Sequence, residues 1–146
     1  MHRPFDAALA ARYMTVLRAG SADDLRALVL LSGLPSNANA LDTVPQVARC
    51  SLRGLVWKAL LRIGPLDPAE YAALVRRGPS ADDHRVREDA RRTFSKNDDF
   101  CARVPNAKII RVLNAYVHSA GNTRGIYAQS MSLLAAPFLY VMPEPD

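Results

Sequence analysis

Hydrophobic side chains recur every three or four residues along most of the chain, which is the period of an α-helix buried on one face. The first such segment runs from Phe5 to Leu17, and Gly20 provides a stop signal. A second begins after Ser21, whose side chain could cap a helix, and ends at the Gly33-Leu34-Pro35 turn. The pattern therefore predicts two amphipathic helices near the start of the chain.

The middle of the chain alternates helical segments with breaks. Residues 35–45 form the most loop-like stretch, and a third helix is expected over residues 46–63, closed by Gly64-Pro65. Asp67-Pro68 is typical of a helix start, because aspartate caps well and proline is tolerated in the first helical position. This pair predicts a short helix that extends to Val75.

Three further helices are expected in the second half of the chain. Ser80 can cap the first of them, over residues 81–94, and the second covers residues 106–120. The apolar positions of the first are Val86, Ala90 and Phe94. A polar turn at residues 121–125 leads into a last apolar helix over residues 127–141. Strand-like alternation is scarce, so the sequence predicts an all-α fold.

Composition agrees with one globular domain and excludes several other classes. The chain has 146 residues, of which 49% are hydrophobic and 23% charged, too apolar for a disordered protein. No apolar run approaches the roughly 18 residues of a membrane span, and the first six residues lack a signal-peptide core. We therefore expect a cytoplasmic protein whose two cysteines, Cys50 and Cys101, are reduced core thiols.

The net charge of +5 raises the question of a nucleic-acid partner. Its 16 arginines and 3 lysines are scattered among acidic neighbours, and the longest clean basic cluster is the pair Arg76-Arg77. We therefore expect no nucleic-acid partner. A basic helical nucleic-acid binder stays open as an alternative, which a steep salt dependence of DNA or RNA affinity would reveal.

Common signatures of self-contained enzymes are absent from the sequence. It contains no P-loop, no HExxH, no CxxC and no GxSxG motif. The histidines His2, His84 and His118 lie far apart without ligand-like spacing, so we expect them at the surface or its rim. The sequence therefore predicts no metal site and no cofactor of its own.

Two segments are unusual for solvated helices. In residues 84–94, Asp89 and Arg92 lie one helical turn apart, so the carboxylate could orient the guanidinium. In residues 127–132, Gln129 lies near the start of an apolar helix and could present its amide outward. Taken separately, the two segments also fit a charged solvent face and a solvent-facing glutamine, and both interpretations stay open on helix physics alone.

Four ordered strings together resemble the TBC domain, the all-helical module that activates Rab-type small GTPases. Residues 53–57 match the R-G-x-x-W helix, and residues 86–94 fit I-x-x-D-x-x-R-T-F with valine in the first place. Residues 110–116 match the helix that precedes the Y-x-Q-G-M-N motif, which here reads Y-A-Q-S-M-S over residues 127–132. The G-P-S turn and the L-A-A-P-F-L string are most similar to the mitotic-checkpoint branch.

The resemblance implies a role for each motif residue. By similarity, Arg92 would be an arginine finger and Gln129 a glutamine finger, both supplied in trans to a GTPase. Asp89 would hold the arginine, and Tyr127 would pack and aim the glutamine loop. Two further motif residues are expected to be structural: Arg53, paired with a carboxylate, and Trp57, in the helical core.

The chain departs from the family pattern at two positions. The glycine after the glutamine is Ser130, and the asparagine of the motif is Ser132. Glycine reaches backbone conformations that serine adopts with strain, and asparagine offers hydrogen bonding on two sides. We therefore expect Gln129 to be present but imperfectly presented.

The resemblance covers about residues 25–142, so we expect an N-terminal helix and turn over 1–24 and a partial TBC domain over 25–146, without its C-terminal half. It implies a GTPase activator rather than an enzyme, with GTP and Mg²⁺ carried by a Rab/Ras-type partner. A scaffold subunit, a role in mitotic exit, spindle checkpoint or septation, and a location at the spindle pole or cytoskeleton are further implications. The alternative is a non-catalytic fragment that binds a GTPase or scaffold without activating hydrolysis.

Overall fold

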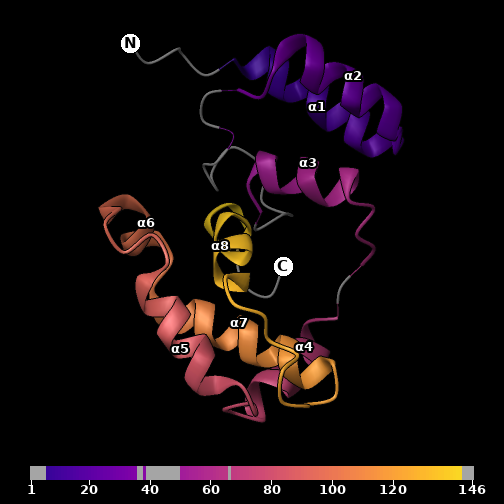
Figure 1. The fold of residues 1–146 in the computed structure, drawn as a ribbon. Coiled ribbons are helices and arrows are strands. Elements are labelled where there is room, and N and C mark those ends of the chain that lie inside the picture. The colour runs from indigo at the N-terminus through magenta and orange to yellow at the C-terminus, as the bar shows by residue number, and fades with distance from the viewer. Residues whose placement is uncertain (1–5, 36–37, 39–49, 66, 143–146) are drawn as a thin grey trace. The chain divides into compact units, whose positions relative to one another are not determined.

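The computed structural model describes residues 6–35, 38, 50–65 and 67–142. Within these ranges every regular element is an α-helix, which confirms the predicted all-α fold (Figure 1). The helices are α1 (Ala7–Ala19), α2 (Ala22–Ser32), α3 (Leu52–Leu60), α4 (Pro68–Arg76), α5 (Asp83–Arg92), α6 (Asp98–Arg103), α7 (Asn106–Ser119) and α8 (Met131–Val141). None of them is long and apolar enough to cross a bilayer.

The described residues form two compact units, of which the first contains α1, α2 and α3. These helices pack against one another around a small apolar core. Its buried members are Ala10, Tyr13, Leu25, Leu28, Ala38, Leu52 and Val56. The predicted end of α1 and start of α2 are confirmed. Gly20 ends α1 in the left-handed conformation, and the Ser21 hydroxyl caps α2 by accepting a hydrogen bond from the backbone N–H of Asp24.

The third helix is shorter than expected. It begins at Leu52, because Ser51 caps it and accepts a hydrogen bond from the N–H of Gly54, and it ends at Leu60. Residues 46–49 of the expected helix lie outside the described ranges. Close packing explains why position 54 is a glycine, since a Cβ there would overlap the sulfur of Cys50 and lie 3.0 Å from the carbonyl oxygen of Val141.

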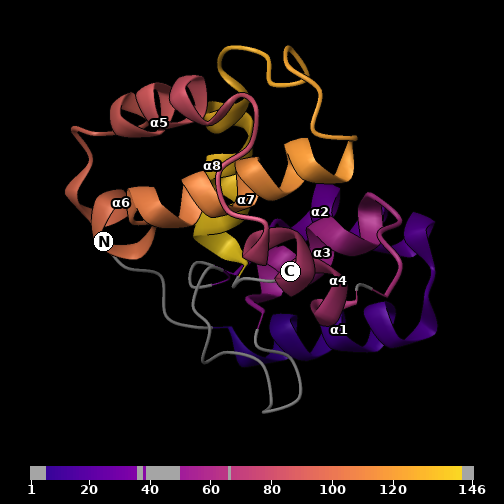
Figure 2. The same cartoon turned by 90° about the horizontal axis from the view of Figure 1, so that it is seen from below.

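The second unit contains α4 to α8, up to Tyr140. Helix α7 packs against both α5 and α4, and α5 runs alongside it (Figure 2). The buried core of this unit consists of Val86, Ala90, Phe100, Val104, Ile109, Leu113, Val117, Tyr127, Ala136 and Leu139. Asp67 caps α4 with proline in the first helical position, as the sequence predicts.

Both boundaries of α5 differ from the predictions, and the second unit contains a helix that was not predicted. Helix α5 begins at Asp83, and its N-cap is Asp82 rather than Ser80. It ends at Arg92, so the expected core residue Phe94 lies beyond it at φ 48° and is 45% exposed. Helix α6 was not expected at all, although Asn97 caps it with a hydrogen bond from the N–H of Phe100.

Predictions for cysteine and histidine are partly wrong. Neither cysteine is in a disulfide, but only Cys50 is buried, and Cys101 is exposed on α6. His118 is buried on α7 rather than at the surface, because its Nε2 lies 2.9 Å from the carbonyl oxygen of Gly78 and so ties α7 to the end of the α4 segment. In the described ranges, no three His, Cys, Asp or Glu side chains gather as metal ligands would.

Candidate functional site

Helix α5 carries the acidic and basic residues of the candidate site. Val86, Asp89 and Ala90 are spaced by three and one, so they lie on the same side of the helix, and all three are buried against the rest of the second unit. Arg92 is the last residue of the helix, and its side chain is 63% exposed. The helix therefore places a buried carboxylate one turn before an exposed guanidinium.

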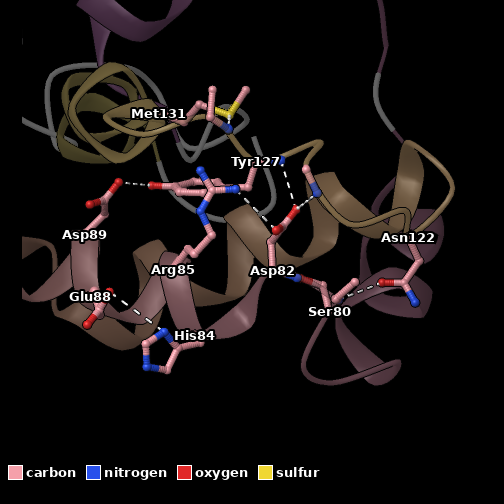
Figure 3. Close-up of polar contacts among 12 residues, drawn as sticks. Ser80, Asp82, His84, Arg85, Glu88, Asp89, Asn122, Tyr127 and Met131 are labelled. Carbon is pink, nitrogen blue, oxygen red and sulfur yellow. Dashed lines mark hydrogen bonds and ion pairs between the residues drawn. The ribbon is translucent and has the colours of Figure 1, made fainter.

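The Asp89 carboxylate is the hub of the site. Its Oδ1 forms an ion pair with Nη2 of Arg92, which confirms that the two side chains meet across one turn. Its Oδ2 accepts a hydrogen bond from the Tyr127 hydroxyl at 2.7 Å (Figure 3). The same oxygen accepts a second one from the backbone N–H of Ser130 at 3.0 Å. A single buried group thus holds the arginine on one side and the 125–130 loop on the other.

The surroundings shift the pKa values of both acidic members of this cluster. Burial pushes the pKa of Asp89 upward, but the hydrogen bonds from Tyr127 and Ser130 and the Arg92 charge outweigh it and lower the pKa overall. Burial and the hydrogen bond to Asp89 raise the pKa of the Tyr127 phenol. Asp89 is therefore ionised and Tyr127 protonated at neutral pH, as the arginine pair and the phenol-to-carboxylate bond require.

Gln129 lies on a turn rather than in a helix. Helix α8 begins at Met131, not at Tyr127, because the backbone of Ser130 is not in the right-handed helical region; the N–H groups of Tyr127 and Ser130 donate to side-chain carboxylates. Ser130 adopts φ 72°, in the left-handed region that favours glycine. This turn leaves the Gln129 side chain exposed immediately before an apolar helix.

Four of the residues predicted for the site share one open depression. It has a volume of about 160 Å³ and is lined by Arg85, Glu88, Asp89, Arg92, Tyr127 and Gln129. We call it the Arg92–Gln129 hollow. It brings together a cation and a side-chain amide from segments that lie far apart in the sequence. The other two predicted residues, Arg53 and Trp57, lie on α3 in the first unit, where both are partly buried.

Two residues that support the site had no role in the sequence predictions. The Thr93 hydroxyl is buried, donates to the carbonyl oxygen of Asp89 at 2.7 Å, and lies 2.8 Å from the Ser132 hydroxyl in a second hydrogen bond. It thereby connects the end of α5 to the start of α8. Asp82 accepts hydrogen bonds from Gly125 and Tyr127. Its place two helical turns before Asp89 is the signal that could have identified it.

The Arg92–Gln129 hollow can act on a negatively charged, hydrolysable group. A guanidinium offers planar N–H donors that suit phosphate oxygens, and a primary amide both donates and accepts, so it can orient a water molecule. Comparison with known proteins identifies the family: the Rab-GTPase-TBC domain family matches residues 50–146. The chain belongs to this family.

Several individual relatives of this TBC-family chain are mitotic check point or cell division control proteins. It is 35% identical over 125 residues to a candidate mitotic check point protein BUB2 of Dictyostelium discoideum, covering 84% of the chain and 34% of that protein. It is 40% identical over 90 residues to cell division control protein 16 of Schizosaccharomyces pombe, covering 62% and 29%. It is 29% identical over 136 residues to mitotic check point protein BUB2 of Saccharomyces cerevisiae, covering 84% and 42%.

The chain thus spans only about a third of the length of these relatives. No solved structure matches it significantly. Family membership therefore stands on the sequence match, and the all-helical architecture agrees with it.

The lowered pKa of Asp89 predicts an acid-sensitive fold. A carboxyl group whose pKa is lower in the folded state stabilises the fold fully above its unfolded pKa of about 4 and loses this contribution as pH falls through the folded value. We expect the thermal midpoint to fall below about pH 4, and to fall less in Asp89→Asn. Circular dichroism melts between pH 7 and 3 measure this, with Asp98→Asn on α6 as the control; equal acid slopes for Asp89→Asn and wild type would contradict it.

Proposed function

We propose that this TBC-family chain activates GTP hydrolysis by a small GTPase of the Rab or Ras type. Arg92 is the arginine finger and Gln129 the glutamine finger, both supplied in trans. The partner carries GTP and Mg²⁺, so the chain needs no cofactor of its own. The chain is then a regulator of another protein's reaction rather than an enzyme with its own substrate.

The physical case starts from why GTPases are slow by themselves. Negative charge develops on the phosphate oxygens in the transition state, and the attacking water is loosely held. A guanidinium placed against that charge is typically worth about 10³–10⁵ in rate. An amide that holds the water in line reduces the entropy lost in reaching the transition state.

The observation that carries the proposal is the meeting of Arg92 and Gln129 at one open hollow. Asp89 supports both, since its carboxylate pairs with Arg92 and accepts from the backbone N–H of Ser130, the neighbour of Gln129. The Arg92 side chain stays largely exposed in spite of this pairing. An incoming phosphate can therefore meet a guanidinium whose orientation is already restricted.

The cellular role follows from the relatives and is part of the same proposal. Two of them are named as mitotic check point proteins and one as a cell division control protein. These names support a role for the chain in mitotic exit, the spindle checkpoint or septation. A scaffold subunit and a location at the spindle pole or cytoskeleton go with that role.

Ser130 supports the alternative of a TBC-like chain that binds a GTPase or scaffold without accelerating hydrolysis. Its left-handed backbone costs a non-glycine residue about 1 kcal/mol or more. Strain of this size, next to Gln129, would allow the loop to populate conformations in which the amide is misplaced. The two functions differ in whether the chain accelerates GTP hydrolysis.

We expect the double variant Ser130→Gly, Ser132→Asn to hydrolyse GTP on the partner about fivefold faster than wild type, as relief of about 1 kcal/mol permits. Glycine takes φ 72° without strain, and a depression of about 170 Å³ beside Ser132 has room for the larger amide. Single-turnover hydrolysis on the cognate GTPase measures the effect, with Ser95→Gly as an exposed control. No gain in rate would remove the idea that Gln129 is imperfectly presented.

The proposed function is tested by single-turnover GTP hydrolysis on a panel of Rab-type and Ras-type GTPases with and without the chain. We expect one or a few GTPases to respond with a rate increase that saturates with chain concentration. Saturable binding without any increase would favour the non-catalytic alternative. If no GTPase of the panel were bound or accelerated, the proposed function would be contradicted, and binding to a scaffold would be the part of the alternative that stands.

A further inference from the structure

We propose that Asp82 is a positioning residue that anchors the loop carrying Gln129 and so sets the placement of the glutamine amide. This role rests on the proposed function, in which Gln129 acts on the partner's nucleotide. Asp82 lies outside the TBC motifs that the sequence displays, and no role was expected for it. Its environment in the second unit shows what it does.

The carboxylate of Asp82 is almost fully buried and is directed at the loop. Its side chain is 1% exposed, and Oδ2 accepts hydrogen bonds from the N–H of Gly125 at 2.9 Å and of Tyr127 at 3.1 Å (Figure 3). Oδ1 faces the Arg85 guanidinium at 3.4 Å. A buried carboxylate with three partners of this kind is ionised and held in one orientation.

The Asp82 side chain binds the loop that carries Gln129 instead of capping its own helix. An aspartate in the N-cap position usually accepts a hydrogen bond from the first turn of its own helix. Asp82 is the N-cap of α5 but makes no such bond. Its acceptor oxygen is turned to residues 43 and 45 positions later in the chain. The geometry therefore favours a tertiary role over a local one.

Asp82 and Asp89 hold the two ends of the same loop. They lie seven residues apart, which is close to two helical turns, so both carboxylates project from one face of α5. Asp82 binds the backbone at Gly125 and Tyr127, and Asp89 binds it at Ser130. Gln129 lies between these anchors, so its backbone is restrained from both directions.

Arg85 and the Tyr127 ring fill the space between the two carboxylates. The guanidinium of Arg85 lies 5.7 Å from the centre of the Tyr127 ring while it pairs with Asp82 (Figure 3). The Tyr127 hydroxyl reaches Asp89 from the same ring. The path from Asp82 to the Arg92–Gln129 hollow is thus continuous through Tyr127, because Asp82 binds its backbone N–H and Asp89 binds its hydroxyl.

The turn that carries Asp82 is itself attached to neighbouring segments. Asn114 of α7 accepts a hydrogen bond from the N–H of Ser80 at 2.8 Å. Asn122 accepts one from the N–H of Ala81 at 3.0 Å (Figure 3). An anchor restrains a loop only if its own base is fixed. These amide side chains supply that base, so loss of the Asp82 carboxylate should loosen the loop rather than the helix.

The test compares Asp82→Ala, which removes both acceptor oxygens, with Asp82→Asn, which keeps one, and with Asp98→Ala on α6 as control. Amide hydrogen exchange by NMR reports the loop without any partner. We expect Gly125 and Tyr127 to exchange at least about tenfold faster in Asp82→Ala. The buried amides of α7 should keep their protection, and Asp82→Asn should lie between wild type and alanine.

A second arm measures single-turnover GTP hydrolysis at saturating chain. We expect Asp82→Ala to lower the stimulated rate by about 10- to 100-fold with unchanged affinity for the GTPase. In a Gln129→Ala background the same change should cost less than about twofold, because the amide it positions is already gone. A merely destabilising role would lower the rate equally in both backgrounds.

The proposal is overturned if Asp82→Ala leaves exchange at Gly125 and Tyr127 unchanged, or if its effect on the rate does not depend on Gln129. A chain that stimulates no GTPase at all would refute the proposed function instead. In that case the exchange measurement alone decides whether Asp82 anchors the loop.

Discussion

Replacing Arg92 by alanine should lower the GTPase-activating rate of the chain by at least about 10³-fold, the largest effect expected of any single substitution. The guanidinium is 63% exposed and is held by the buried Asp89 carboxylate, so it can meet phosphate charge without reorganising. Truncation removes that charge from the transition state while leaving the packed face of α5 intact. Single-turnover hydrolysis and an equilibrium binding assay on the same GTPase measure the two quantities separately.

Two further variants make the Arg92 result specific. Arg91→Ala removes another exposed arginine from the same last turn, outside the Arg92–Gln129 hollow, and should change the rate by less than about twofold. Arg92→Lys keeps the charge but loses the planar fork, so it should fall between wild type and alanine. If the GTPase hydrolysed GTP as fast with Arg92→Ala as with the wild-type chain, the arginine-finger role would be wrong.

Replacing Gln129 by alanine should lower the rate by about 10²-fold, since the water then loses the group that holds it in line. The side chain is exposed and makes its contribution only when a nucleotide is present, so the stability of the chain should stay unchanged. Thermal melts and single-turnover hydrolysis check the two halves of this prediction.

The matched control for Gln129 is Arg124→Ala, an exposed change in the same connection between α7 and α8. It should leave the rate near wild type. A large loss in Arg124→Ala, or a lowered melting temperature in Gln129→Ala, would mean that loop integrity rather than the amide explains the effect.

The parts of the fold that local chemistry decides could be predicted from the sequence. Gly20 and Ser21 separate α1 from α2, and Asp67 opens α4, because capping and left-handed glycine depend on neighbours within one turn. The Asp89–Arg92 pair belongs to the same class, since residues three apart meet on any helix.

The parts that tertiary contacts decide could not be predicted in this way. Helical periodicity extends the last helix back to Tyr127, but Ser130 adopts φ 72°, which a right-handed helix does not contain, and the Asp82 and Asp89 carboxylates hold the N–H groups of Tyr127 and Ser130 in the resulting loop. Phe94 fits the apolar spacing of α5 yet lies beyond its end at φ 48°. Each error arises where a distant or non-helical backbone contact overrides the local pattern.

The candidate site shows the same division. Motif order alone associated Arg92 with Gln129, because the resemblance supplied a contact that no local rule contains. The bond from Tyr127 to Asp89 joins residues 38 positions apart and becomes visible only in the folded second unit. Asp82 was missed because its place two helical turns before Asp89 indicates a shared face but not which loop the carboxylate holds.

The central claim is that the chain supplies both an arginine and a glutamine to its GTPase. It is tested most directly by single-turnover hydrolysis on a GTPase whose own water-positioning glutamine has been replaced by leucine. We predict that the wild-type chain still accelerates this GTPase, and that Arg92→Ala and Gln129→Ala each abolish the acceleration. Acceleration of the unmodified GTPase together with no effect on the leucine variant would contradict the claim.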